Sequence, residues 1–189
     1  ILSSHSGNTE ETLSSYEIAR QRKCQMLVIA TGGKLIQAAT QAGVPVWKFE
    51  HAGQPRASVG FSFGLLLAAF SRLALLPDPS AELNDALQTM RQQQESLSAH
   101  VPAAQNPANR YAGQLVGRWV SVFGSGILAP VARRWKGQIS ELAKAWAVFE
   151  GLPESNHNTL AGLEFPESLL ERTSALFLRS GLDRPRNAL

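Results

Sequence analysis

The 189-residue chain is 44% hydrophobic and 17% charged, and its 18 basic and 15 acidic residues give a net charge of +3. This length allows one sizeable core or two small ones. The charge is mild and forms no block of one sign, which argues against the clustered basic face of a nucleic-acid-binding protein. The one cysteine, Cys24, excludes an intrachain disulfide and fits a reducing cytoplasm.

No membrane segment or secretory signal is expected. The longest apolar run, residues 61–76, is interrupted by serine, glycine and arginine and is too broken to span a membrane. We therefore expect a soluble, cytoplasmic protein. Both ends of the sequence are abrupt, because Ile1-Leu2 resembles the tail of a strand and residues 184–189 resemble the start of another element. We expect a piece of a longer protein.

The first functional signal is the stretch Ser4 to Thr12, which leads into a helix predicted over residues 11–22. Its hydroxyl groups crowd around Gly7, directly before a helix N-terminus whose free N–H groups and positive dipole end suit an anion. The stretch is therefore a candidate phosphate loop. A loosely fitting capping box, in which these side chains only cap the helix, is equally compatible. The hydroxyl residues are Ser4, Ser6 and Thr9.

Strands and helices then alternate. Short apolar runs at residues 25–30 and 44–49 predict strands, and residues 34–42 have helical spacing. This alternation predicts right-handed βαβ units in a parallel sheet, where ligands bind beyond the carboxyl ends of the strands. The rule places residues 4–9, 31–34 and 50–56 on one rim.

Pro55-Arg56 precedes an apolar helix predicted over residues 57–75. An arginine at a helix start opposes the helix dipole, so a bound anion would offset the cost. A solvated arginine is equally compatible with the sequence.

The middle of the chain predicts a polar helix and then a linker. Ser80 is expected to cap a helix that runs to about Ser98. Residues 101–107 are rich in proline, alanine and amide side chains and form the best linker. We therefore divide the chain into a first domain of residues 1–105 and a second of residues 106–189.

The second half repeats the alternation of helix and strand. The strand, glycine turn and helix suggest a mononucleotide-like α/β unit, although G-x-G alone is weak evidence for a nucleotide. The expected elements are a helix at 109–115, a strand at 118–123, a tight loop at Gly124-Ser125-Gly126, a largely helical segment at 127–149, a strand and loop at 148–158, a helix at 168–173 and a strand at 175–178.

Two residues of the second half are candidates for chemistry. Glu141 is expected inside a helix, where it is either a base or a surface carboxylate paired with Lys144 or Lys136. His157 stands between two asparagines in a loop, where histidines are either functional or simply exposed. No metal is expected, because the chain has four histidines and no ligand spacing such as H-E-x-x-H.

Four motifs, in order, resemble the bifunctional phosphoglucose/phosphomannose isomerases, whose chains contain two sugar isomerase (SIS) domains. The resemblance covers essentially the whole chain. His5 stands where that family usually has tyrosine, and Thr159 where it commonly has an acid. The motifs are S-x-S-G-N-T at residues 4–9, P-R at 55–56, R-W-K-x-Q-x-x-E-x-A-K at 134–144 and L-P-E-x-N-H-N at 152–158.

The resemblance implies an α/β protein with two SIS-type three-layer αβα domains and parallel sheets, each incomplete in this chain. It implies an isomerase that interconverts glucose 6-phosphate and mannose 6-phosphate with fructose 6-phosphate through an enediolate, without a cofactor, in a homodimer. The implied roles are phosphate binding by Ser4, Ser6 and Thr9, proton transfer by Glu141, enediolate stabilisation by Arg56, and ring opening by His157 donated from the partner subunit.

Two other functions share the phosphate loop. A non-catalytic phosphosugar-binding SIS module, such as a sugar-phosphate sensor, would need neither Glu141 nor His157. A ketose–aldose isomerase of aminated or heptose sugars should lack the motifs of the second half.

Overall fold

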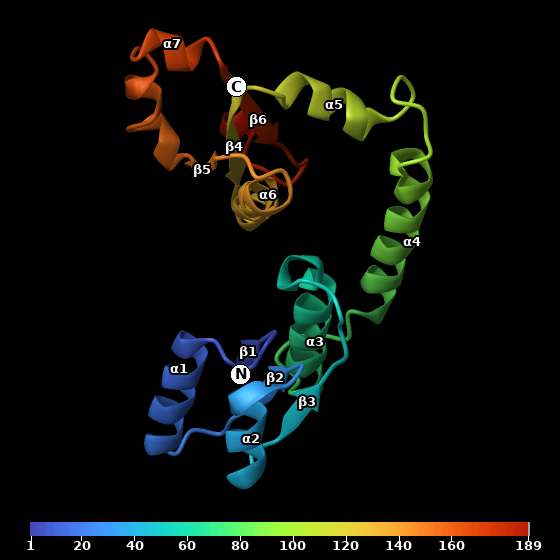
Figure 1. Ribbon diagram of the computed structural model, residues 1–189, viewed down its shortest axis with the longest axis vertical. Coiled ribbons are helices and arrows are strands. Elements are labelled where there is room, and N and C mark those ends of the chain that lie inside the picture. The colour runs from blue at the N-terminus through green and yellow to red at the C-terminus, as the bar shows by residue number, and fades with distance from the viewer. Residues whose placement is uncertain (189) are drawn as a thin grey trace. The chain divides into compact units, whose positions relative to one another are not determined.

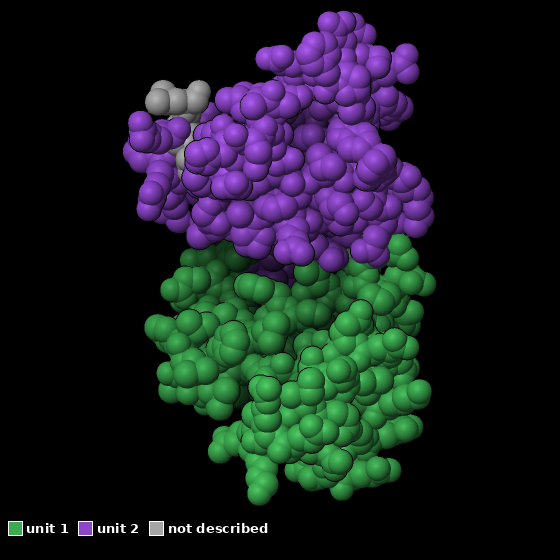
Figure 2. Space-filling model, turned by 90° about the vertical axis from the view of Figure 1, so that its left-hand side faces the viewer, with its two compact units in different colours: residues 1–86 green, residues 87–189 purple. Residues whose placement is uncertain are grey.

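The computed structural model describes residues 1–188. It divides into two compact units, Ile1–Ala86 and Leu87–Leu189, which are coloured separately in Figure 2. The boundary between the units falls inside a helix, α4 (Ser80–Leu97). The division of the chain at residues 105 and 106 stays a prediction.

The first unit contains a parallel sheet of three short strands, in the order β1-β2-β3 (Figure 1). Helices connect successive strands, as the alternation predicted. The elements are β1 (Leu2–Ser4), α1 (Glu10–Gln21), β2 (Val28–Ala30), α2 (Gly33–Gln41) and β3 (Val46–Lys48). The strands end in register, with Ser4 opposite Ala30 and Ala30 opposite Lys48, so their carboxyl ends form one rim.

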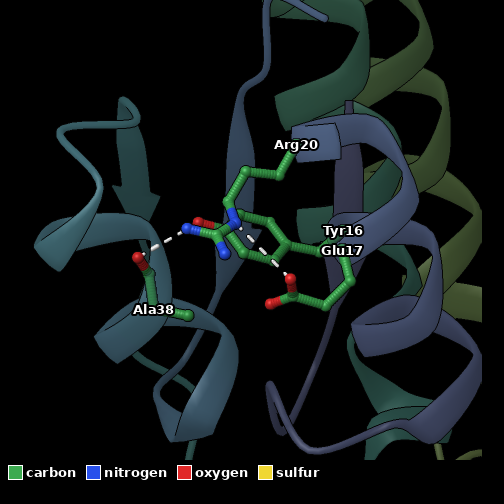
Figure 3. Close-up of polar contacts among 4 residues, drawn as sticks. All are labelled: Tyr16, Glu17, Arg20 and Ala38. Carbon is green, nitrogen blue, oxygen red and sulfur yellow. Dashed lines mark hydrogen bonds and ion pairs between the residues drawn. The ribbon is translucent and has the colours of Figure 1, made fainter. Parts of the chain in front are cut away.

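Burial of apolar side chains holds α1 and α2 to this sheet. The buried cluster consists of Leu2, Tyr16, Val28, Leu35 and Ala39. Tyr16 is 1% exposed, and its hydroxyl donates a hydrogen bond to the Ala38 carbonyl at 3.1 Å, which ties α1 to α2 (Figure 3). The ion pair between Arg20 Nε and Glu17 Oε2 at 3.4 Å joins side chains that are 59% and 51% exposed, so it contributes little to stability.

Three helical elements follow the first sheet. The 3₁₀ turn η1 (Pro55–Ala57) precedes α3 (Val59–Arg72), so the predicted apolar helix is present but shorter than residues 57–75. Helix α4 begins at Ser80, as predicted. Within the described residues, no helix is both long enough and apolar enough to cross a membrane.

The second unit contains another parallel sheet, in the order β5-β4-β6. Its buried cluster, Val120, Val122, Ala132 and Ala147, packs α6 against β4 and β5. The helices and strands are α5 (Pro107–Leu115), β4 (Trp119–Ser125), α6 (Ala129–Leu142), β5 (Ala147–Leu152), α7 (Glu167–Leu170) and β6 (Thr173–Leu178). The predicted α/β fold with parallel sheets is confirmed.

Two local predictions for this unit are wrong. Gly124 and Ser125 belong to β4 and not to a loop. A side chain at Gly124 would place its Cβ 2.7 Å from the Leu128 carbonyl oxygen, so glycine here allows close packing of the strand against the segment that enters α6. The helix predicted to reach residue 149 ends at Leu142, and Lys144 adopts a left-handed conformation with φ of 57° before β5 begins.

Candidate functional site

The loop that follows β1 closes on itself through its hydroxyl groups. Ser4 is 7% exposed, and its Oγ accepts a hydrogen bond from the Gly7 N–H at 3.1 Å. The Ser4 and Thr9 hydroxyl oxygens are 2.9 Å apart. Ser6 lies on the exposed side of the loop, where its Oγ accepts from the Asn8 N–H at 3.1 Å. The structure therefore brings Ser4 and Thr9 into contact and places Ser6 in the same turn.

These hydroxyl contacts contradict the capping-box alternative. Thr9 is the N-cap residue of α1, yet within the described chain its side chain makes no capping hydrogen bond. The hydroxyl groups shape the loop instead of the helix start. The loop thus stands directly before the N-terminal turn of α1, where the helix dipole favours an anion.

The loop that follows β2 is packed against this first loop. Asn8 Oδ1 accepts a hydrogen bond from the Lys34 N–H at 3.0 Å, and the Gly7 carbonyl accepts from the Leu35 N–H at 2.9 Å. Gly7 has φ of +67°, and a Cβ at this position would lie 1.9 Å from the Gly32 carbonyl oxygen. Only glycine fits this approach. Two of the three segments of the predicted rim, residues 4–9 and 31–34, are therefore in contact, and α1 and α2 both begin there.

A pair of histidines joins the loop of residues 4–9 to the segment after β3. His5 Nε2 and His51 Nδ1 are 2.9 Å apart, and the two rings meet edge to face. Phe49 contacts the edge of His5 and stacks on Phe61, with ring centroids 5.2 Å apart. In the sequence, His5 stands out only as a departure from the isomerase motif, because no local pattern connects it to a residue that lies 46 positions away.

Arg56 lies in η1, the element that follows β3 in the chain. It is partly buried, and its Nη2 donates a long hydrogen bond of 3.5 Å to Gln54 Oε1. The turn is held by the buried Ser58, whose hydroxyl donates to the Pro55 carbonyl at 2.8 Å. The predicted arginine thus stands in an ordered turn whose chain leaves the same rim.

Glu141 is the penultimate residue of α6 and is exposed within the described structure. Its backbone carbonyl accepts a hydrogen bond from Lys144 Nζ at 2.7 Å, so this lysine caps the end of the helix. Helix α6 starts after the carboxyl end of β4 and returns the chain to the amino end of β5. Glu141 therefore lies at the amino ends of the strands of the second sheet.

His157 lies at the other end of the same sheet. It follows β5 through the short turn η3 (Glu154–Asn156), it is exposed, and its N–H donates to the Glu154 carbonyl at 2.9 Å. The adjoining Thr159 donates from its hydroxyl to Glu150 Oε2 at 2.8 Å, which fixes the loop to β5. Because the 14 residues of α6 span roughly 20 Å, Glu141 and His157 of one chain are not brought together.

No group of three or more His, Cys, Asp or Glu side chains that could hold a metal ion occurs in residues 1–188.

Comparison with protein families and curated proteins gives consistent matches. Residues 104–189 match the model of the bacterial phosphoglucose isomerase C-terminal SIS domain. The whole chain is 36% identical to the bifunctional phosphoglucose/phosphomannose isomerase of Caldicellulosiruptor bescii and covers 56% of that protein. For the enzyme of the same name from Aquifex aeolicus, the identity is 36% over 87% of the chain and 47% of the relative. The chain therefore spans about half the length of the curated relatives it matches.

Another relative carries a different activity in its name. The D-glucosamine-6-phosphate 4-epimerase of Sulfolobus acidocaldarius is 30% identical over 85% of the chain and 49% of its own length. Among solved structures, a Clostridium difficile protein proposed to be a phosphosugar isomerase superposes with a TM-score of 0.69 at 12% identity, over 99% of this chain and 53% of that one. At this identity the superposition shows the fold alone.

Proposed function

We propose that this chain, which belongs to the family of SIS-domain phosphoglucose isomerases, is part of an enzyme that interconverts glucose 6-phosphate and mannose 6-phosphate with fructose 6-phosphate. The observation that carries the proposal is the closed hydroxyl loop of residues 4–9, set at the carboxyl rim of a parallel sheet. It occurs in a chain that is 36% identical, over its whole length, to a bifunctional phosphoglucose/phosphomannose isomerase.

The phosphate group would bind at this rim of the first unit. Ser6 and Thr9 offer hydroxyl donors there, and Ser4 holds the turn in shape. The N-terminal turns of α1 and α2 start at the same place, so their dipoles favour a dianion. The binding energy of a phosphate remote from the reacting carbons can then hold the sugar in place for catalysis.

Glu141 and Arg56 would serve the reacting carbons. Aldose–ketose isomerisation needs one base that removes a proton from C2 and returns it to C1, and a carboxylate in reach of both carbons can do this. Negative charge develops on the oxygens of the enediolate, where a fixed guanidinium stabilises it most. No metal or cofactor takes part in the proposed steps.

His157 would assist ring opening in the site of a partner subunit, in a homodimer. The support is geometric, because Glu141 and His157 lie at opposite ends of the second sheet of one chain. A second copy related by two-fold symmetry can supply the missing histidine to each site. We place the enzyme in the cytoplasm, since its free Cys24 is exposed.

The alternatives are a sugar-phosphate sensor and an epimerase. A sensor is less well supported, since the named relatives are enzymes. The epimerase relative makes glucosamine 6-phosphate a necessary comparison substrate, because a loop that binds the 6-phosphate does not discriminate at C2 or C4.

The test uses the longest natural form of the protein in a coupled assay for fructose 6-phosphate. Glucose 6-phosphate and mannose 6-phosphate are offered separately, and glucosamine 6-phosphate is followed for epimerisation. Turnover of the first two sugars that is lost in Glu141→Gln supports the proposal. A folded protein that binds these sugars without turnover would leave the sensor.

A further inference from the structure

The second sheet changes direction at β4. The chain leaves β4 to form β5 on one side, and then crosses to form β6 on the other side. Loops that leave neighbouring strands in opposite directions open a crevice outside the carboxyl ends, and α/β proteins bind ligands at such switch points. The strands of the first unit, in the order β1-β2-β3, show no such reversal among the described residues.

A cavity of about 740 Å³ lies at this switch point. Three segments line it: residues 125–127 at the end of β4, 152–156 at the end of β5, and 182–186 after β6. Its volume falls within the roughly 300–1,000 Å³ that is usual for small-molecule sites. All three segments belong to the second unit, and none of the loop residues 4–9 lines the cavity. It includes Gly126, which the proposed function does not use.

The charged groups of the cavity are arranged around one ordered carboxylate. Asp183 Oδ1 accepts a hydrogen bond from the hydroxyl of Ser125 at 2.7 Å, and Oδ2 accepts from the Ser180 N–H at 3.1 Å. Ser125 is 2% exposed, so the first contact is buried at its strand end. These bonds fix the segment after β6 against the end of β4. Asp183 thus acts as a clamp for the residues that follow it.

The clamp places Arg184 and Arg186 on the wall of the cavity. Both are exposed, and within residues 1–188 neither forms an ion pair with a carboxylate. With Asp183 as the one acid in the lining, the charged groups sum to +1. A guanidinium presents paired N–H donors that match the oxygens of a phosphate. The remaining wall offers the Asn156 amide beside apolar surface from Ile127 and Leu152.

We propose that this crevice is a second ligand site, which binds a phosphorylated small molecule with Arg184 and Arg186 on its phosphate group. The cavity is too large for a phosphate ion alone, and its mixed wall suits a short polar body attached to the phosphate. Asn156 is positioned to hydrogen-bond hydroxyl groups of that body. None of the residues that the proposed function assigns to the isomerase site lines this crevice.

The test uses glycerol 3-phosphate as the probe, in calorimetric titrations of the longest natural form. Binding at the first unit is removed in all samples by Ser4→Ala with Thr9→Val. The background variant with these two substitutions is expected to bind one equivalent of glycerol 3-phosphate. Adding Arg184→Ala and Arg186→Ala to it is expected to weaken this binding at least tenfold. Glycerol without its phosphate is expected not to bind. Thermal melting checks that each variant is folded.

Two further variants make the test specific. Arg118→Ala with Arg172→Ala removes the same charge at the amino ends of β4 and β6, and is expected to leave the affinity unchanged. Arg184→Lys with Arg186→Lys keeps the charge but loses the paired donors, so it should bind glycerol 3-phosphate with intermediate affinity. This variant keeps the test valid if the alanine variant fails to fold. The proposal is overturned if the background does not bind the probe, or if both arginine pairs weaken binding equally. A variant that carries Arg184→Ala and Arg186→Ala but keeps Ser4 and Thr9 is expected to turn over glucose 6-phosphate as the wild type does. The proposed function is therefore judged separately.

Discussion

A mixture of two inactive variants tests whether His157 serves a partner's site. Glu141→Gln and His157→Gln each remove one acid–base group, and each homodimer is expected to lose about 10²–10⁴-fold in turnover. The ends of α6 are roughly 20 Å apart, so the two residues of one chain cannot act together. In a heterodimer, one site combines the intact Glu141 of one chain with the intact His157 of the other. Random pairing of equal amounts then restores about a quarter of wild-type activity.

The assay is fructose 6-phosphate formation after the two variants are co-expressed or refolded together. A second mixture, of wild type with the chain that carries both substitutions, is the control. If the residues act across the interface, every heterodimer in this control has two damaged sites, so about a quarter of the activity remains. If both residues act within one chain, this control retains about half, and the mixture of single variants regains nothing. That pair of results would refute the geometric argument.

Three further predictions concern the first unit. Gly7→Ala is expected to destabilise the protein more than Gly43→Ala in chemical denaturation. Both glycines have φ of +67°, but only at Gly7 would the new Cβ lie 1.9 Å from a carbonyl oxygen. Equal losses of stability would contradict the packing of the two loops. The Gly43 change should cost about 1–2 kcal/mol, the penalty of a left-handed L-residue. Thr9→Val is expected to raise KM for glucose 6-phosphate, with Thr9→Ser restoring it; a loss in kcat alone would argue against a phosphate role. Tyr16→Phe should lower the free energy of unfolding by about 1 kcal/mol, since it removes a hydrogen bond from a residue that is 1% exposed. As a control, Tyr111→Phe should leave the free energy of unfolding unchanged, because Tyr111 is 63% exposed.

The sequence predicted the features of the site that depend on local order. Ser4, Ser6 and Thr9 fall where a strand gives way to a helix, and that position alone places them on the carboxyl rim of a parallel sheet. The contact of Asn8 with Lys34 joins residues 26 positions apart, and that of His5 with His51 spans 46 positions. No periodicity marks such pairs, so only the folded structure could reveal them.

The errors in the second unit have the same origin. Glycine and serine favour turns locally, yet Gly124 lies within β4, where the close approach of the α6 entry segment leaves no room for a side chain. The alanine-rich sequence after Leu142 favours helix, but Lys144 reverses the chain through a left-handed conformation and Ala147 becomes buried in β5. In both places tertiary packing outweighs local propensity.

The course of α6 explains how one sheet could serve two active sites. A βαβ unit returns its helix to the amino ends of the strands, so a base on the last turn of α6 is presented away from the loops at the carboxyl ends. The loop after β5 presents His157 at those carboxyl ends. On the proposed function, each second unit therefore offers Glu141 to one site and His157 to the other, and a two-fold axis makes the exchange reciprocal. Dissociation of the dimer would then separate the base from the histidine in both sites at once, so activity and subunit association should be lost together on dilution.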